Sequence, residues 1–118
     1  MATQQIPGLT RTDLQQYDLS VPGKEVIQNR VDVDREAPAI KHWHPGEEVI
    51  YVIAGTLEYE IDGQPGRIVN AGEALTVPAE RVHSVRNVGD GTATELATYI
   101  VEEGQPLFNL SGEDGIHV

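Results

Sequence analysis

The sequence predicts an all-β domain, folded as a barrel or a sandwich. Three observations support this fold class: short segments in which apolar and polar residues alternate, turn-forming residues between these segments, and a content of 12 glycines and 7 prolines. Alternation with a period of two places one face of a strand in the core, and Gly or Pro between such runs ends each strand. A chain of 118 residues is long enough for one such domain and too short for two.

Seven segments carry the strand pattern. Residues 49–53 and 57–61 flank a turn at Gly55, so we expect these two strands to form a hairpin. The polar face of the first strand, with Gln28 and Arg30, fits either solvent or the wall of a polar pocket. The predicted strands are residues 25–34, 49–53, 57–61, 67–69, 74–77, 82–87 and 94–101.

Both ends of the chain are expected to lie outside the barrel. Residues 1–23 are interpreted as a polar arm with room for a short helical turn after Thr10 or Thr12. Residues 24–103 are the predicted barrel domain, and residues 104–118 a loosely attached tail. No signal segment and no apolar run of about 18 residues is present, so we expect a cytoplasmic protein without a membrane partner.

Charge and composition exclude further classes. The formal net charge of −11, from 19 acidic and 8 basic residues, repels phosphate backbones and anionic lipids, so nucleic acid is not an expected partner. The simplest interpretation of this charge is a well-solvated surface. The absence of cysteine excludes disulfides, thiolate metal sites and cysteine nucleophiles.

Residues 41–48 concentrate groups that bind metal ions. If His42 and His44 lie on a strand, their side chains share one face and Trp43 points to the other. The Pro-Gly turn that follows would bring a strand with Glu48 back alongside them. Imidazole and carboxylate together suit divalent transition ions better than Ca²⁺ or Mg²⁺. The segment therefore predicts a metal site that lacks one donor.

Two spacing patterns resemble the two motifs of the cupin superfamily. The first motif runs H-x-H, three spacers, Glu, six spacers, Gly, and is matched by His42, His44, Glu48 and Gly55. The second runs Gly, five spacers, Pro-x-Gly, two spacers, His, three spacers, Asn, and is matched by Gly72, Pro78, His83 and Asn87. The resemblance spans residues 41–87 and implies a double-stranded β-helix, a small RmlC-like jelly-roll barrel with a metal inside it near one mouth.

The resemblance also implies roles for single residues. In cupins the matching side chains bind the ion, so the implied ligands of one Fe²⁺, Mn²⁺, Ni²⁺ or Zn²⁺ are His42, His44, Glu48 and His83. Inward residues on the same strand faces as Glu48 and His83, two or four positions away, would line an apolar cup, namely Ile50, Val52 and Val85. The fourth histidine, His117, is interpreted as a surface or structural residue.

The second motif departs from the cupin pattern at one position. Glu80 stands where the motif has glycine. This residue implies either a different turn conformation or strain of roughly 1–3 kcal/mol if its φ is positive.

The implied site leaves the reaction open, because fold and metal do not determine chemistry. The leading hypothesis is a metal-dependent enzyme of dioxygenase type, an oxidoreductase whose small-molecule substrate offers an enol, catechol-like or keto-acid oxygen pair. Glu48 is the candidate catalytic residue, as a general base. The alternatives are a metal-dependent lyase or isomerase, and a non-enzymatic protein that binds or senses a small molecule.

Apolar residues at outward positions predict a homodimer. This set comprises Trp43, Val49, Tyr51 and Ile53, which one small barrel cannot cover. Tyr59 and Tyr99 fit either the core or the pocket.

Overall fold

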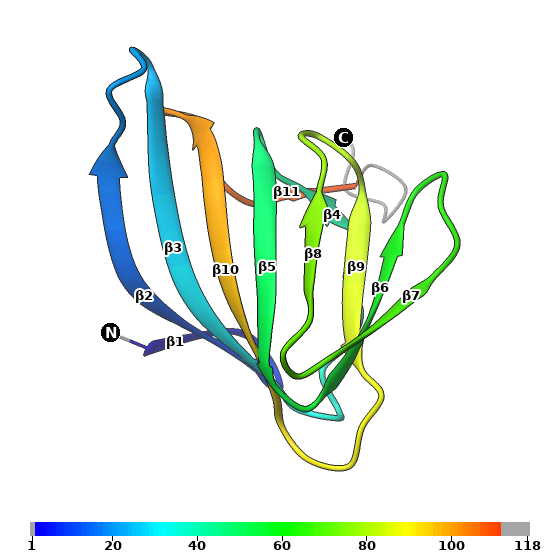
Figure 1. The fold of residues 1–118 in the computed structure, drawn as a ribbon. Coiled ribbons are helices and arrows are strands. Elements are labelled where there is room, and N and C mark those ends of the chain that lie inside the picture. The colour runs from blue at the N-terminus through cyan, green and yellow to red at the C-terminus, as the bar shows by residue number, and fades with distance from the viewer. Residues whose placement is uncertain (1, 112–118) are drawn as a thin grey trace.

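The computed structural model describes residues 2–111, which form two antiparallel β-sheets that face each other in the jelly-roll arrangement (Figure 1). The predicted all-β fold class is confirmed. The larger sheet contains, in spatial order, β1 (Ala2–Ile6), β2 (Leu9–Asp18), β3 (Lys24–Val33), β10 (Ala93–Glu102), β5 (Glu47–Ala54) and β8 (Ala74–Val77). The smaller sheet contains β11 (Asn109–Leu110), β4 (His42–Trp43), β9 (His83–Asn87), β6 (Thr56–Ile61) and β7 (Arg67–Asn70). No helix in the described range is long and apolar enough to cross a membrane.

The core lies between the two sheets and is filled by alternate residues of each strand. On β5, Ile50 and Val52 are buried, whereas Val49 and Tyr51 on the opposite face are exposed. The motif residue Asn87 has a structural role, because its side-chain amide donates to the backbone carbonyls of Val33 and Gly91. These bonds tie the loop after β9 to the end of β3.

The predicted hairpin of residues 49–53 and 57–61 is wrong, although both segments are strands. β5 pairs with β10 and β8, while β6 pairs with β7 and β9, so the two strands belong to different sheets. The turn between them is at Gly55, which has a φ of 80° and where a Cβ atom would lie 2.8 Å from Ala93 Cα. The chain crosses here from one sheet to the other, because the apolar faces of β5 and β6 must oppose each other across the core.

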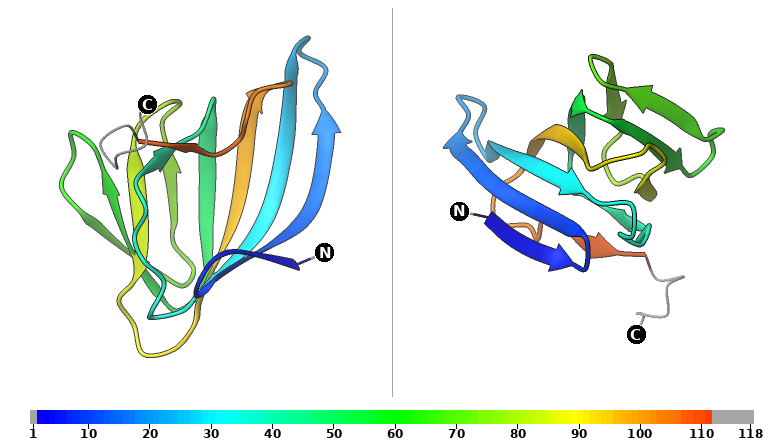
Figure 2. Two further views of the ribbon diagram at one scale, coloured as in Figure 1. Left: turned by 180° about the vertical axis from the view of Figure 1, so that it is seen from behind. Right: turned by 90° about the horizontal axis from the view of Figure 1, so that it is seen from below.

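The predicted helical turn near Thr10 or Thr12 is also wrong. Residues 9–18 form β2, which pairs with β3 in a register that sets Leu9 opposite Val33. Only the first part of β2 packs inward, and the register shifts between Asp13 and Gln15. Because so little of β2 packs inward, its sequence shows no clear alternation of apolar and polar residues. The hairpin of β1 and β2 extends the edge of the larger sheet that lies farthest from β6 and β7 (Figure 2).

Residues 104–111 are attached to the barrel more closely than the predicted loose tail. β11 pairs with β4, and Leu107 packs against the core. His117 and the rest of residues 112–118 lie outside the described residues.

The polar face of β3 lies on the outside of the larger sheet. Gln28 hydrogen-bonds the side chains of Gln15 and Thr98, and Arg30 forms an exposed ion pair with Asp32. Of the two readings left open by the sequence, the solvated face fits these contacts.

Candidate metal centre

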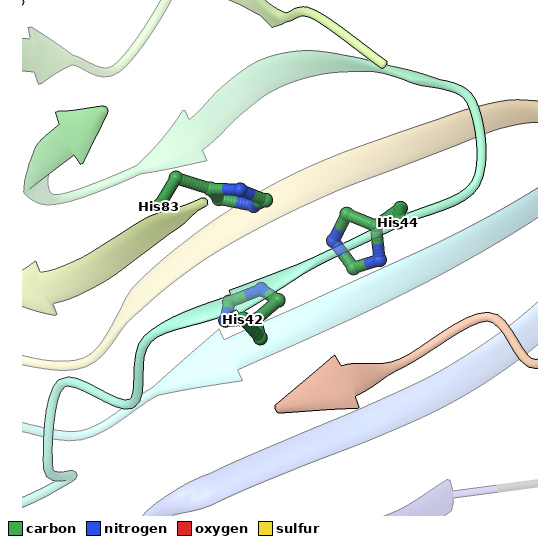
Figure 3. A group of neighbouring side chains, drawn as sticks. All are labelled: His42, His44 and His83. Carbon is green, nitrogen blue, oxygen red and sulfur yellow. The ribbon is translucent and has the colours of Figure 1, made fainter. Parts of the chain in front are cut away.

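Three of the four predicted ligands come together at one end of the smaller sheet. His42 lies on β4, His44 directly follows this strand, and His83 begins β9 (Figure 3). His42 and His83 are direct partners in the pairing of β4 with β9, which explains why residues 41 positions apart meet. One ligand atom from each ring lies within 4.8 Å of the others. This geometry allows the three-histidine cluster to bind one metal ion.

Each histidine ring is oriented by a backbone carbonyl. In all three rings Nδ1 lies within hydrogen-bond distance of a carbonyl oxygen, which can only accept, so Nδ1 carries the proton. The partners of His42, His44 and His83 are the carbonyls of Ile40, Leu107 and Arg81, at 2.7, 2.8 and 2.9 Å. When such a ring is neutral, its Nε2 atom is left with a lone pair, as a metal ligand requires.

Glu48 reaches the same point from the larger sheet. Its Oε1 atom lies 3.2 Å from Nε2 of both His44 and His83, and the residue is 3% exposed. Glu48 therefore approaches across the interior of the barrel and not from a strand paired with β4. Burial alone would raise the pKa of Glu48, but hydrogen bonds donated by His44 and His83, which need a proton on Nε2, outweigh burial and lower this pKa to about 2 in the metal-free site.

The negative charge of the Glu48 carboxylate is not compensated by neutral histidines. With Nδ1 protonated, Nε2 of a neutral His83 would face the Glu48 carboxylate as one acceptor against another. Within residues 2–111, His44 Nε2 is buried without a hydrogen-bond partner, although Glu48 is near. Burial, together with the neighbouring imidazole of His83, lowers the pKa of His42 to about 4, so this ring is neutral at pH 7. A divalent cation would satisfy all of these groups, and Glu48 as its fourth ligand stays a prediction.

The site contains an acid that sequence reasoning missed. Glu95 on β10 is buried and accepts a short hydrogen bond from the hydroxyl of Tyr59. Burial and the charge of Glu48 raise the pKa of Glu95 to about 8, so this carboxyl is protonated at neutral pH. The signal was present in the alternation, because Glu95 shares the inward parity of Ala97 and Tyr99.

Two adjoining cavities open beside these groups. An inner cavity of about 40 Å³ is lined by His42, Glu48 and His83 and also by Tyr59, Glu95 and Tyr99. The two tyrosines left open between core and pocket are thus buried and line the pocket. A second, apolar cavity of about 190 Å³ adjoins the first. Of the predicted apolar lining, Val85 lines both cavities, whereas Ile50 and Val52 belong to the core.

The loop that carries Glu80 supports the backbone of the site. Glu80 has a φ of 64°, so of the two alternatives the strained turn is the one found. Its N–H donates to the carbonyl of His44 at 2.9 Å. The left-handed residue therefore holds the segment that carries a candidate ligand.

The sequence and the fold are similar to known proteins. Residues 29–99, more than half of the chain, match the family described as Cupin domain. Polyketide synthase CurC of Streptomyces cyaneus is 36% identical over 72 residues, which are 60% of this chain and 39% of that protein. The chain spans less than two fifths of the length of the curated relatives that it matches.

Two solved structures show how widely the fold is shared. Oxalate decarboxylase of Lactobacillus farciminis has a TM-score of 0.73 at 16% identity, over 96% of this chain and 34% of that one. Hydroxypropylphosphonic acid epoxidase from S. wedmorenis has a TM-score of 0.69 at 17% identity, over 84% of this chain and 54% of that one. At such identities the similarity extends to the fold alone.

Proposed function

We propose that this chain, which belongs to the cupin domain family, is a metal-dependent enzyme of dioxygenase type that acts on a small oxygen-bearing molecule. The observation that carries the proposal is the cluster of three histidines, two of which, His42 and His83, lie in the wall of a cavity. A structural metal site is normally closed by four protein ligands, whereas a catalytic site keeps positions open toward a cavity.

The side chains around the cluster are suited to catalysis. A divalent transition ion held there would supply Lewis-acid or redox chemistry. Glu48 is ionised and within reach of the cavity, so it can accept a proton. The apolar cavity beside it would keep water from the bound substrate.

The comparisons support a substrate class. The relative at 36% identity is named a polyketide synthase, and a polyketide carries carbonyl groups on alternate carbons. The enol form of such a 1,3-diketone offers the oxygen pair expected for a chelating substrate. Two proteins of the same fold are named as enzymes, so the fold is compatible with turnover.

A second candidate is a lyase or isomerase that works by proton transfer without O₂. The observation that favours it is the buried Glu95, which is protonated where Glu48 is ionised. Two carboxyl groups with pKa values pushed apart in one cavity can act as acid and base. Tyr59 keeps the Glu95 carboxyl in place.

Oxygen uptake separates the candidates. We expect protein loaded with Fe(II), Mn(II) or Ni(II) to consume O₂ with at least one member of a panel of flavonols, catechols and 1,3-diketones. Conversion without O₂ uptake that is lost in both Glu48→Gln and Glu95→Gln would instead indicate the lyase or isomerase. The exposed variant Glu36→Gln is the matched control. A ligand that binds and stays unchanged with every metal would contradict both enzymatic proposals and favour sensing.

A further inference from the structure

We propose that the apolar cavity holds the apolar body of an organic anion, and that Arg11 binds the negative group of this ligand. The inference rests on the proposed function in one respect, since the ligand would be the substrate. It adds the charge and the shape of that substrate, and a residue from a part of the chain to which the sequence assigned no role.

The cavity has the size and lining for one substituted ring. Its volume of about 190 Å³ exceeds the roughly 150 Å³ of a dry apolar cavity that holds benzene. Its walls are apolar apart from His42, and they include Leu9, Ile40, Val85 and Phe108. An apolar ring would gain the full benefit of burial here, whereas a polar one would lose its hydration.

The apolar cavity continues into the inner one. Leu9, His42, Val85 and Phe108 line both, so a ligand seated among them reaches the inner cavity with one end. Arg11 and the candidate ligands meet that end. The two cavities together fit a molecule with an apolar body and an oxygen-bearing head.

Arg11 is placed as an anion-binding group. It lies on β2 opposite Val31, whose side chain is buried, so both face the barrel interior. Its guanidinium carbon lies 5.2 Å from the centre of the Phe108 ring. That ring also packs against His42, with centroids 5.1 Å apart, so the cation lies next to the candidate metal centre.

The guanidinium has donor capacity that the protein does not use. Nη1 of Arg11 is buried without a hydrogen-bond partner among the described residues. The ion pair with Asp13 joins Nε to a carboxylate 3.8 Å away that is 71% exposed, and such a contact is weak. A buried N–H without a partner is costly, and a carboxylate is one of the groups that a guanidinium fork can bind through two hydrogen bonds.

The charges around the two cavities limit the groups that could attract an anion. Among described residues that line these two cavities, Arg11 is the one Lys or Arg, in a chain with a net charge of −11. Glu48 in the inner cavity is already in contact with His44 and His83. An anion that prefers this cavity must therefore owe its affinity to Arg11 or to a bound metal, and the experiment has to separate the two.

Calorimetry with two matched probes tests the inference. trans-Cinnamate carries a ring and a conjugated carboxylate, and cinnamamide has the same shape without the charge. We expect cinnamate to bind at least tenfold more tightly than cinnamamide, both in the protein as purified and after removal of metal by a chelator. Arg11→Met should weaken cinnamate binding to the level of cinnamamide and leave cinnamamide unchanged. Arg30→Met, on the outer face of the larger sheet, should change neither affinity, and Ile40→Trp should weaken both.

Three results would overturn the inference: equal affinities for the two probes in the unmodified protein, a preference for cinnamate that survives Arg11→Met, or a preference that disappears with the metal. If Arg11→Met fails to fold, Arg11→Lys should retain part of the preference and Arg11→Gln should lose it. Binding is measured without turnover, so the two proposals fail separately. Absent O₂ uptake with an intact, Arg11-dependent preference removes only the proposed function, and turnover without that preference removes only this inference.

Discussion

At the residue scale, one backbone carbonyl beside each of the three histidines determines which ring nitrogen can bind a metal. The carbonyls of Ile40, Leu107 and Arg81 each fix the proton on Nδ1 and leave Nε2 as a donor to a metal. Two of these carbonyls come from within two residues of the histidine that they orient, whereas Leu107 comes from the segment before β11. The segment before β11 is therefore part of the site.

We expect His83→Ala to lower metal affinity by more than the roughly 10–100-fold that loss of a hydrogen-bond partner of a ligand costs, because the variant loses one of the donors itself. Equilibrium dialysis followed by elemental analysis would measure this loss in protein purified without a histidine tag. Since the imidazoles must be unprotonated to bind and the pKa of His42 is about 4, affinity should also fall as pH drops toward this value. His117→Ala is the control of the same residue type. Full stoichiometric metal with unchanged affinity in His83→Ala would show that the second-motif assignment is wrong.

Glu95 should make the metal-free protein less stable as pH rises. Its pKa is about 8 in the folded protein against 4.5 for an ordinary glutamate, so between these values only the unfolded chain releases the proton. Unfolding is then favoured increasingly from about pH 4.5 to about pH 8, at a total cost on the order of 4–5 kcal/mol. Glu95→Gln should remove this dependence, so that the variant gains stability relative to the unmodified protein between pH 5 and pH 8. Urea denaturation at four pH values measures this difference in stability. If the stabilities of the two proteins changed with pH in parallel, the raised pKa of Glu95 would be contradicted.

At the scale of elements, the site depends on where two sheets approach each other. The turn between His44 and Glu48 contains Gly46, where a Cβ atom would lie 1.9 Å from the carbonyl oxygen of Ile100 on β10. Only glycine allows the chain to pass so close to β10 while it moves from the smaller sheet to the larger one. This passage carries Glu48 to the side of the barrel opposite the histidines.

We expect Glu80→Gly to stabilise the protein by about 0.5–1 kcal/mol. The φ of 64° costs a residue with a Cβ about 1–2 kcal/mol, and the added freedom of glycine in the unfolded chain offsets part of the gain. Thermal or urea unfolding at one pH measures the change. Glu36→Gly, at an exposed turn residue without positive φ, should destabilise by a similar amount. Equal losses in both variants would show that the turn at Glu80 is not strained.

At the scale of the whole molecule, the outer face of the larger sheet exposes a group of apolar side chains. Val49, Tyr51 and Ile53 on β5 are 41%, 48% and 46% exposed, and Ile100 on the neighbouring β10 is 38% exposed. Trp43 lies on β4 of the other sheet and does not extend this face. We propose that a second copy of the chain covers this face. Pairing two such faces would remove their apolar side chains from water.

Sedimentation velocity at micromolar concentration should show a dimer. Tyr51→Glu places a charge in the centre of the proposed interface and should shift the protein to a monomer. Ile68→Glu, at a similarly exposed residue of β7 in the smaller sheet, should leave the dimer intact. A monomer in the unmodified protein would end the dimer proposal without affecting the fold. The cytoplasmic location and the lack of nucleic-acid partners also stay predictions.

The sequence by itself determined the fold class and the candidate ligand residues. Strand alternation is a local property with a period of two, so the segments from residue 25 to residue 101 were identified with bounds close to those observed. The spacing of the two motifs identified the three histidines that meet in the structure. Glu95 was in principle available, since an acidic residue at an inward position marks a functional site.

Only the tertiary structure decided which strands pair and which distant residues complete the site. β5 and β6 are adjacent in sequence and lie in different sheets, because their partners are chosen by burial of both apolar faces across the core. β2 has too few inward apolar residues to be recognised locally, yet its pairing with β3 brings Arg11 into the cavity. The pKa of Glu95 likewise depends on its depth and on the charge of Glu48, which lies 47 positions away in the sequence. Pairing, depth and charge are non-local quantities, and a local pattern carries no information on them.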